Sequence, residues 1–240
     1  VVGTYNAVAT FTYDTANYNT IADMNAVLTI NKAKVALPEA TSFVYDGTAH
    51  TAVASHDLYT VEGATATVVG SYEAVVTLKD TVNYEWAEEF NGKVAWTITK
   101  ATYDMSGIKF ENVTVTYDGV EHVIEITGTL PAGVTVAYTT NKGTVVGTYN
   151  AVATFTYDTA NYNTIADMNA VLTINKAKVA LPEATTSFVY DGTAKVAVAA
   201  HDLYTVERAT ETVVGSYEAT VTLKDTANYE WAEEFDGKVA

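Results

Sequence analysis

The sequence contains no cysteine, and its basic residues are few. Without cysteine the chain forms no disulfide and offers no thiol for catalysis or metal binding. Its 13 lysine and arginine residues stand against 29 aspartate and glutamate residues, which gives a net charge of −16. A surface of this sign repels nucleic acid and anionic lipid. We therefore expect neither as a partner.

Long apolar runs are also absent. No run approaches the roughly 18 residues that a membrane-spanning helix needs, so we expect no membrane span in this segment. Helical periodicity is missing too, whereas valine, threonine and tyrosine are abundant and the hydrophobic fraction is 48%. These residues suit a pleated, half-buried surface. The composition therefore predicts a folded, all-β protein.

A long internal repeat dominates the sequence. Residues 1–41 are identical to residues 145–185, and after one extra threonine at Thr186 residues 42–95 align with residues 187–240. Eight positions differ between the aligned copies: His50/Lys195, Thr51/Val196, Ser55/Ala200, Gly63/Arg208, Ala66/Glu211, Val75/Thr220, Val82/Ala227 and Asn91/Asp236. Such near-identity indicates a tandem array.

Three short signals recur within the long period. The tripeptide Tyr-Asp-Gly occurs at Tyr45–Gly47, Tyr117–Gly119 and Tyr190–Gly192. A Gly-Thr/Ser-Tyr signal occurs at Gly3–Tyr5, Gly70–Tyr72, Gly147–Tyr149 and Gly215–Tyr217, and Asn-Tyr follows each of them. The order of these signals indicates two related but unequal modules in each period.

We predict four parts on this basis. Residues 1–33 are the carboxy-terminal half of one module type, and residues 34–100 are a Tyr-Asp-Gly-bearing module. Residues 101–177 are a complete module of the first type, and residues 178–240 are a second Tyr-Asp-Gly-bearing module without its last strand. Because an isolated half-module buries little apolar surface, we expect a window of a longer array, or another chain that completes the ends.

Alternation of apolar and polar residues predicts the strands. In residues 147–157 the side chains of Tyr149, Ala151, Ala153, Phe155 and Tyr157 share one face, which is typical of a half-buried strand. Tyr72, Ala74, Val76 and Leu78 repeat the pattern. Further strands are expected at Ser42–Tyr45, Tyr59–Val61, Val94–Thr99, Val113–Tyr117, Val134–Tyr138 and Val171–Ile174. With Asp-Gly and Asn-Gly turns between them, these strands predict small antiparallel β-sandwich modules.

The connections between the predicted modules are short. The stretches Ile98–Tyr103 and Ile174–Val179 contain neither glycine nor proline and run almost directly from one strand into the next. Flexible linkers are usually rich in glycine and serine. We therefore expect stiff joints and an elongated array of modules.

The sequence offers no set of residues for catalysis. His56-Asp57 and His201-Asp202 recur, but neighbouring residues on a strand point to opposite faces, and no nucleophile motif accompanies them. No zinc or EF-hand spacing occurs. Glu85, Glu88 and Glu89 could offer oxygens near a loop, although a solvated turn explains them better. We expect no enzyme, no metal and no cofactor.

Two sets of tyrosines are assigned different roles. The tyrosines of the Gly-Thr/Ser-Tyr signals lie on apolar strand faces, so we expect core packing with a hydrogen-bonded hydroxyl. The tyrosines that follow asparagine lie in loops and are our candidates for surface contacts: Tyr18, Tyr84, Tyr162 and Tyr229. A loop tyrosine can equally close the end of a sandwich. A crosslink from Lys34 or Lys178 to Asn83 or Asn228 is also conceivable.

The ordered motifs are similar to those of a known class of repeats. The stretch from VTYDGVEHVIEITGTL to AVLTINKA, residues 115–177, resembles the MBG-type repeat of large bacterial surface proteins. The stretch from FVYDGTAHTAV to KVAWTITKA, residues 43–101, resembles the neighbouring Tyr-Asp-Gly-bearing, immunoglobulin-like repeat, which is common in Gram-positive bacteria. The resemblance implies an extracellular, cell-surface or filamentous adhesin whose repeats form a stalk or fibre, and it implies no catalytic residues.

Three functions remain open from the sequence. The first is a non-catalytic structural segment whose modules form a stiff extracellular stalk and contact neighbouring modules of the same array. The second is a multivalent module that binds a glycan or a protein, with the ligand unknown. The third is a filament subunit whose modules pair with other copies through open sheet edges.

Overall fold

The computed structural model describes all 240 residues and contains 23 β-strands and no helix. The chain is all-β and holds many small sheets, as the sequence predicts. No helix is present that could cross a membrane. The chain divides into two compact units, Val1–Tyr103 with Asp158–Thr164 and Asp104–Tyr157 with Ile165–Ala240.

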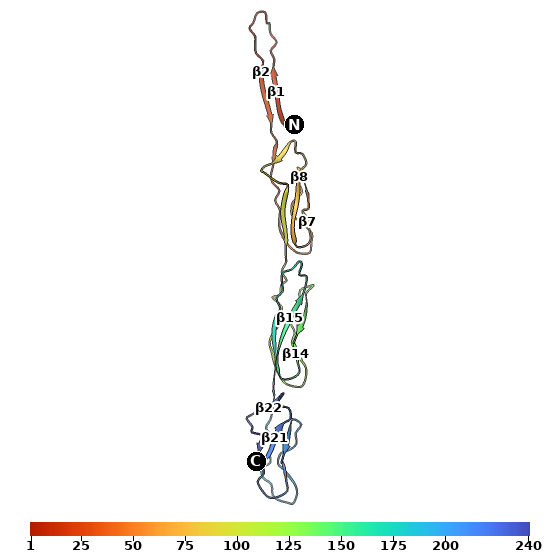
Figure 1. Cartoon of the computed structure of the whole chain (residues 1–240), viewed down its shortest axis with the longest axis vertical. Coiled ribbons are helices and arrows are strands. Elements are labelled where there is room, and N and C mark those ends of the chain that lie inside the picture. The colour runs from red at the N-terminus through yellow and green to blue at the C-terminus, as the bar shows by residue number, and fades with distance from the viewer. The chain divides into compact units, whose positions relative to one another are not determined.

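The first unit begins with a two-stranded hairpin (Figure 1). Strands β1 (Gly3–Ala9) and β2 (Met24–Ile30) pair antiparallel, from Gly3 opposite Ile30 to Ala9 opposite Met24. Almost every residue of both strands is exposed. A lone hairpin of this kind is marginally stable in water because it buries little apolar surface.

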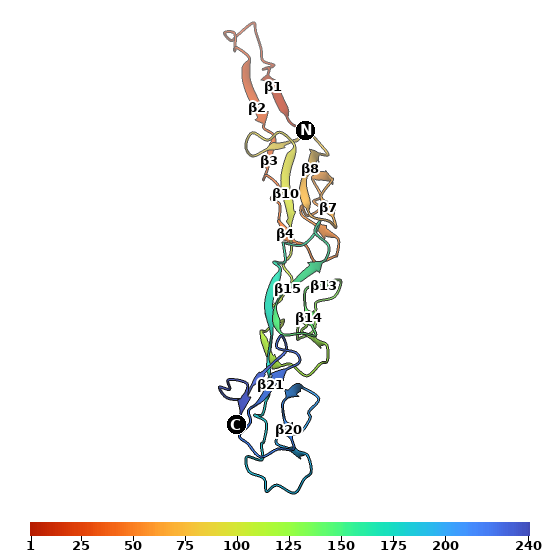
Figure 2. The ribbon, with the colours of Figure 1, turned by 60° about the horizontal axis from the view of Figure 1, so that its bottom comes forward.

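The remainder of the first unit contains a four-stranded sheet in the order β4-β10-β8-β6 (Figure 2). Its strands are β4 (Phe43–Val44), β6 (Tyr59–Glu62), β8 (Gly70–Leu78) and β10 (Lys93–Thr99). Two small sheets accompany it, and their strands are β3 (Ala33–Val35) with β9 (Tyr84–Trp86) and β5 (His50–Thr51) with β7 (Thr65–Ala66).

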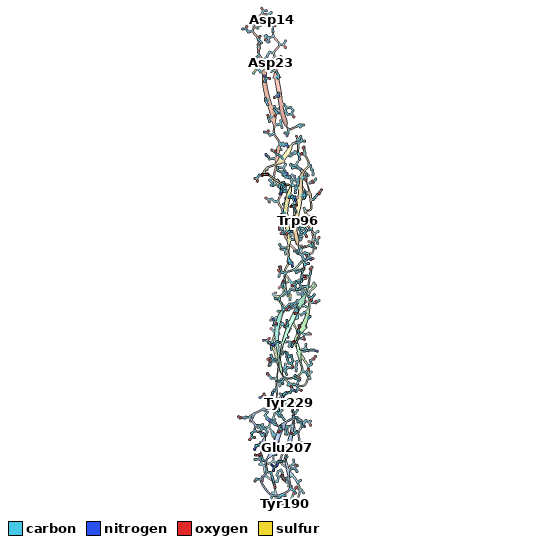
Figure 3. The ribbon with its side chains drawn as sticks, in the orientation of Figure 1. Asp14, Asp23, Trp96, Tyr190, Glu207 and Tyr229 are labelled. Atoms are coloured by element: carbon cyan, nitrogen blue, oxygen red, sulfur yellow. The ribbon has the colours of Figure 1, made fainter.

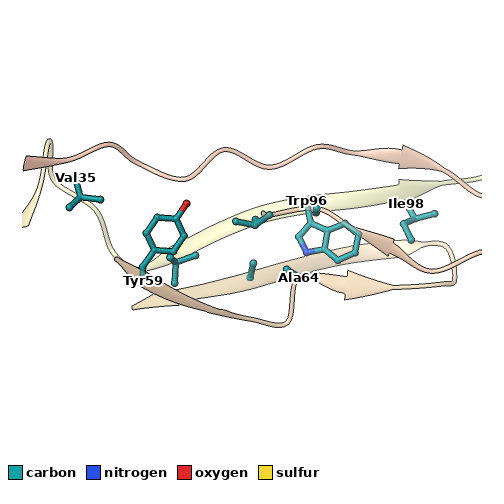
Figure 4. Close-up of a cluster of buried hydrophobic side chains, with 9 residues drawn as sticks. Val35, Tyr59, Ala64, Trp96 and Ile98 are labelled. Carbon is teal, nitrogen blue, oxygen red and sulfur yellow. The ribbon is translucent and has the colours of Figure 1, made fainter. Parts of the chain in front are cut away.

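One face of this sheet carries the hydrophobic core (Figure 4). Trp96 and Ile98 of β10 are almost fully buried and pack with Tyr59 of β6 and with Ala64, beside β7. Trp96 stacks on Tyr72 of β8, with ring centroids 4.7 Å apart. The alternation along β8 and β10 places these side chains on the same face, because strand side chains repeat every second residue.

The second unit contains two further groups of sheets. The first is a four-stranded sheet in the order β11-β16-β15-β13, with strands β11 (Val113–Thr116), β13 (Thr135–Thr139), β15 (Gly147–Thr156) and β16 (Met168–Asn175). A small sheet pairs β12 (His122–Val123) with β14 (Lys142–Gly143). Phe155, Leu172 and Ile174 lie in the core of this group.

The second group lies in residues 177–240. Its three-stranded sheet runs in the order β19-β21-β23, with strands β19 (Tyr204–Glu207), β21 (Ala219–Leu223) and β23 (Lys238–Val239). The small sheets pair β17 (Ala177–Val179) with β22 (Tyr229–Trp231) and β18 (Lys195–Val196) with β20 (Thr210–Glu211). A cluster around Val198, Tyr204 and Val221 forms its core.

The predicted strand faces are confirmed for the complete sheets. Ala151, Ala153 and Phe155 are buried on β15, and Ala74 and Val76 are buried on β8. The glycines of the Tyr-Asp-Gly turns have φ values of 76° to 82°. This left-handed region favours glycine, which explains the motif.

The expectation of antiparallel sheets is confirmed for most of the strand pairings but not for all of them. Four pairings are parallel: β4 with β10, β11 with β16, β3 with β9 and β17 with β22. In each pairing the two strands are far apart in the sequence, because a parallel pair needs a long crossover connection that returns the chain to the same end. The sheets are therefore mixed.

The long repeat places one sequence in two environments. Phe11 and Leu28 of the hairpin are exposed, whereas their counterparts Phe155 and Leu172 are buried. The difference arises because β15 and β16 lie between β11 and β13, whereas β1 and β2 have no further strand beside them. Burial at these positions therefore depends on the neighbouring strands and not on the local sequence.

Candidate functional site: the joints between successive segments

A five-residue loop occurs four times in the chain, and three of the four lie where two of the predicted parts meet; we call the parts 1–33, 34–100, 101–177 and 178–240 segments. Its sequence is Asp-Thr-Ala/Val-Asn-Tyr, and it occurs at residues 14–18, 80–84, 158–162 and 225–229. Three of these loops contact the segment that precedes them in the chain. We call each such meeting point a joint. The first two joints lie within the first compact unit, and the third lies within the second.

Within each loop the aspartate fixes the asparagine side chain. In the first joint Asp80 Oδ1 accepts hydrogen bonds from the backbone N–H groups of Val82, at 2.9 Å, and Asn83, at 3.0 Å. Asp80 Oδ2 accepts a third from Asn83 Nδ2, at 2.7 Å. An ionised carboxylate can only accept hydrogen bonds, so the amide nitrogen of Asn83 must face it. The Asn83 oxygen is consequently turned away from Asp80.

That oxygen accepts a hydrogen bond from the preceding segment. Asn83 Oδ1 lies 3.2 Å from the backbone nitrogen of Val2, and the sequence separation is 81 residues. The same contact joins Asn161 Oδ1 to Val69 N and Asn228 Oδ1 to Val146 N, each at 3.0 Å. Each valine directly precedes the glycine of a Gly-Thr/Ser-Tyr signal. We call this contact the Asn bridge.

A lysine makes a second contact at every joint. Lys32 Nζ donates to the carbonyl oxygen of Thr81, Lys100 Nζ to that of Thr159 and Lys176 Nζ to that of Thr226, each at 2.6 Å. Each lysine ends the Ile-Thr/Asn-Lys stretch of the preceding segment, and each threonine belongs to the next loop. Charge-assisted bonds of this type are stronger than neutral ones.

The backbone continues the connection without a flexible linker. The N–H of Ala33 donates to the carbonyl of Asn83 at 2.9 Å, and β3 then pairs with β9. In the third joint the N–H of Ala177 donates to the carbonyl of Asn228 at 3.0 Å, and β17 pairs with β22. The chain thus enters the next segment as a paired strand, which agrees with the short connections seen in the sequence.

The loop tyrosines occupy different positions. Tyr162 stacks on Tyr103 at a centroid distance of 3.9 Å and meets Tyr45 edge-on at 5.5 Å. Tyr229 meets Tyr117 edge-on at 5.4 Å. Tyr84 is half-buried in β9. The candidates Tyr84, Tyr162 and Tyr229 therefore lie at joints, where they contact other residues of this chain.

Tyr18 differs from the other three. It lies in the loop of the hairpin and is 70% exposed. Asp14, labelled in Figure 3, holds Asn17 of this loop through its Oδ2 at 2.7 Å, in the same way as the other aspartates. A ligand contact at Tyr18 stays a prediction.

The aspartates of the four loops all have a lowered pKa. Hydrogen bonds from the asparagine side chain, followed by those from the backbone N–H groups, lower the pKa of Asp80 and Asp225 below its ordinary value. The asparagine side chain is also the main cause of the lowered pKa at Asp158. Hydrogen bonds to the charged form favour that form. The loops are therefore held in place by ionised carboxylates.

The other sites considered in the sequence have local roles. His56 stacks on Tyr59 and its Nδ1 accepts the N–H of Leu58, so it forms no pair with Asp57. Lys34 forms an ion pair with Glu85 at 2.8 Å and does not contact Asn83. The amide of Asn83 is used in the joint instead. No group of three or more histidine, aspartate or glutamate side chains is arranged to hold a metal.

No family model matches the chain, and no curated protein matches it in sequence. The function therefore has to be argued from the joints.

Sequence reasoning missed the role of the loop asparagines. It treated Asn-Tyr as a marker of the following tyrosine, because the valine that donates to each asparagine is about 80 or 90 residues away. A signal was nonetheless present. The three motifs that meet at each joint follow one order along the chain: Val-Val-Gly, then a lysine followed by alanine, then Asp-Thr-Ala/Val-Asn-Tyr.

Proposed function

We propose that the chain is a non-catalytic structural segment, a run of small immunoglobulin-like β-sandwich modules that forms a stiff extracellular stalk. In this proposal the modules are residues 34–100, 101–177 and 178–240, with residues 1–33 as half of a further one. The stalk belongs to a bacterial surface protein or adhesin. Its length is set by the number of modules.

The observation that carries the proposal is the repetition of one joint. The Asn bridge, the lysine-to-carbonyl bond and a backbone bond from an alanine N–H to the asparagine carbonyl occur together at all three joints, with nearly equal distances. A flexible string of domains needs none of these contacts, since its linkers are unpaired. Two side-chain bonds and a backbone bond at each joint oppose bending.

The composition and the motifs support the same function. The net charge of −16 makes repeated modules repel one another and keeps long chains apart. The resemblance to MBG-type and Tyr-Asp-Gly-bearing repeats implies a cell-surface location. The aromatic and carboxylate groups at the joints are used in contacts within the array and form no arrangement of nucleophile and base.

Small-angle X-ray scattering of the whole chain tests this function. The wild-type chain is expected to scatter as a stiff, extended particle whose profile does not change with concentration. A triple variant, Asn83→Ala with Asn161→Ala and Asn228→Ala, removes the three Asn bridges. It is expected to bend more freely, with a shorter maximum dimension and a more flexible scattering profile.

The chain supplies its own control for this experiment. Asn17→Ala changes the same motif in a loop that makes no joint within this chain. It is expected to leave the scattering unchanged. A compact or freely bending wild-type particle would refute the stalk, whereas a triple variant that scatters like the wild type would show that the Asn bridges do not stiffen it.

The alternative of a self-assembling filament subunit rests on open sheet edges, such as β6 at the end of the sheet β4-β10-β8-β6. The alternative of a glycan- or protein-binding module rests on Tyr18 and on the acidic surface alone.

A further inference from the structure

Two tyrosine rings lie face to face at the second joint. The ring centroids of Tyr103 and Tyr162 are 3.9 Å apart, and the ring planes differ by only 12°. Both side chains are half-buried and belong to the first compact unit. Aromatic pairs usually pack offset or edge-on, with centroids about 4.5 to 7 Å apart. At the other joints the position of Tyr103 is a valine, Val35 or Val179, so this close pair distinguishes the second joint.

Backbone bonds hold the two rings in this arrangement. Ala101 forms a parallel bridge with Tyr162. The N–H of Ala101 donates to the carbonyl of Asn161 at 3.0 Å, and the carbonyl of Ala101 accepts the N–H of Asn163 at 2.8 Å. The bonds therefore enclose Tyr162 on both sides, two residues before Tyr103 in the other stretch. Separation of the rings requires these bonds to break.

The two hydroxyl groups lie at the same end of the stack. Burial is the largest cause of a raised pKa at Tyr103, the neighbouring Tyr162 and Asp158 follow, and a hydrogen bond between the two tyrosine side chains adds to the effect. A tyrosine side chain makes such a bond through its hydroxyl. The ring carbons next to each hydroxyl, the ortho carbons, are therefore close to those of the other ring.

Two other tyrosine pairs have a different geometry. Tyr45 meets the same Tyr162 ring edge-on, with centroids 5.5 Å apart and an angle of 82° between the planes. Tyr117 meets Tyr229, which is labelled in Figure 3, at 5.4 Å and 88°. These edge-on pairs provide a comparison within the same chain for any chemistry that needs stacked rings.

Face-to-face stacking favours the coupling of two oxidised tyrosines. Loss of one electron and of the hydroxyl proton converts tyrosine into a phenoxyl radical. Its unpaired electron occupies a π orbital perpendicular to the ring, with a large share on the ortho carbons. In stacked rings these orbitals point toward each other, whereas in edge-on rings they do not. Reacting atoms about 3 to 3.5 Å apart with aligned orbitals react most readily.

We propose that Tyr103 and Tyr162 form an oxidative crosslinking site, which yields dityrosine with a one-electron oxidant such as a peroxidase acting with hydrogen peroxide. Each tyrosine gives up one electron and its hydroxyl proton, and a carbon–carbon bond forms between two ortho carbons. Each of these carbons then loses its proton while its oxygen takes one up, which restores both phenols. The two hydrogen atoms lost overall reduce one hydrogen peroxide to two water molecules.

The bond would connect the start of segment 101–177 to the loop at residues 158–162. These are the two stretches that the backbone bonds of Ala101 already hold together. The crosslink would make this connection covalent without moving either backbone far, since the rings are stacked beforehand. The site does not depend on the proposed stalk function.

Photo-oxidation of the full chain tests the site. The dilute protein is illuminated with tris(bipyridine)ruthenium(II) and persulfate, which together act as a one-electron oxidant. The monomer is then isolated and digested with trypsin. Mass spectrometry is expected to find residues 101–109 linked to residues 143–176, at the summed mass of the two peptides less two hydrogen atoms. Links between the edge-on pairs are expected to be at least about tenfold less abundant.

Three phenylalanine variants identify the partners. Tyr103→Phe and Tyr162→Phe each keep the ring and its packing but cannot form a phenoxyl radical, so each is expected to abolish the link. Tyr157→Phe is the matched control, because Tyr157 lies in the same tryptic peptide as Tyr162 and its hydroxyl accepts the N–H of Ile165 at 3.0 Å. This variant is expected to keep the link.

The outcomes decide the proposal. Absence of the link from the oxidised monomer overturns it, as do links of the edge-on pairs that are equally abundant. A link that persists in Tyr162→Phe, or that is lost in Tyr157→Phe, assigns the crosslink to another tyrosine and also overturns it. Circular dichroism of each variant before oxidation checks that the β-structure is retained.

Discussion

The repeated sequence allows one leucine to be tested in two environments. Leu172 of β16 is fully buried, with 0% of its surface exposed, whereas its counterpart Leu28 of β2 is 60% exposed. Truncation of a buried leucine to alanine removes its transfer free energy and leaves a cavity, at a cost of about 3 to 5 kcal/mol. Truncation at an exposed position costs within about 0.5 kcal/mol.

Hydrogen exchange measured by mass spectrometry can separate the two effects. Peptides from residues 135–139 have no identical copy in the chain, and they report on β13, which pairs with β15 in the sheet of Leu172. Leu172→Ala is expected to lower the protection of these amides by about a hundredfold or more, because each 1.36 kcal/mol corresponds to a factor of ten. Leu28→Ala is expected to leave them unchanged.

Two outcomes would contradict this prediction. If Leu172→Ala lowers protection by less than about tenfold, the sheet does not depend on the packing described for β16. If Leu28→Ala lowers it as much as Leu172→Ala, the loss of protection at β13 does not come from the packing of β16. Both variants make the same chemical change, so Leu28→Ala controls for the substitution itself.

Two further predictions concern a turn and a joint. Arg208 adopts a φ of 58°, and its counterpart Gly63 has a φ of 70°. Because this left-handed region favours glycine, Arg208→Gly is expected to raise the free energy of unfolding by about 1 kcal/mol, measured as a higher urea midpoint. A lower midpoint would contradict the strain assigned to Arg208. The hydrogen bond from the Asn161 side chain lowers the pKa of Asp158 in the folded state. The folded state therefore binds fewer protons than the unfolded state as the pH falls. The stabilisation that Asp158 provides is present above about pH 4 and is lost as the pH falls through the lowered pKa. Asp158→Asn is expected to reduce stability near neutral pH and to flatten its loss toward acid in urea titrations, whereas an unchanged pH profile would show that this aspartate does not hold the loop.

The sequence predicted the parts of the fold that depend on local pattern. Strand faces around Ala151 and Ala74 follow from the alternation of apolar residues, and the Tyr-Asp-Gly turns follow from the freedom of glycine. The hydroxyl bonds of the Gly-Thr/Ser-Tyr tyrosines are confirmed, since each donates to a carbonyl four residues earlier. Core packing is confirmed for Tyr72, which stacks on Trp96, but not for Tyr5, which is exposed.

The features that escaped prediction are non-local. A parallel pairing such as that of β4 with β10 joins residues 55 positions apart, and periodicity says nothing about which strands become neighbours. The Asn bridge depends on two loops that meet only when consecutive segments fold. The residues next to Asn161 and Val69 do not reveal that these two residues form a hydrogen bond. The only signal in the sequence is the order of the motifs, which is the same at every joint.

The sameness of the joints makes segments interchangeable. Lys32 is followed by Ala-Lys-Val, and so is Lys176. A deletion that connects Lys32 directly to Ala177 would leave the sequence across the junction unchanged. Val2 would then meet Asn228 in place of Asn83, with the same donor and acceptor. Recombination between the repeats can therefore lengthen or shorten the protein without any compensating mutation at the new junction.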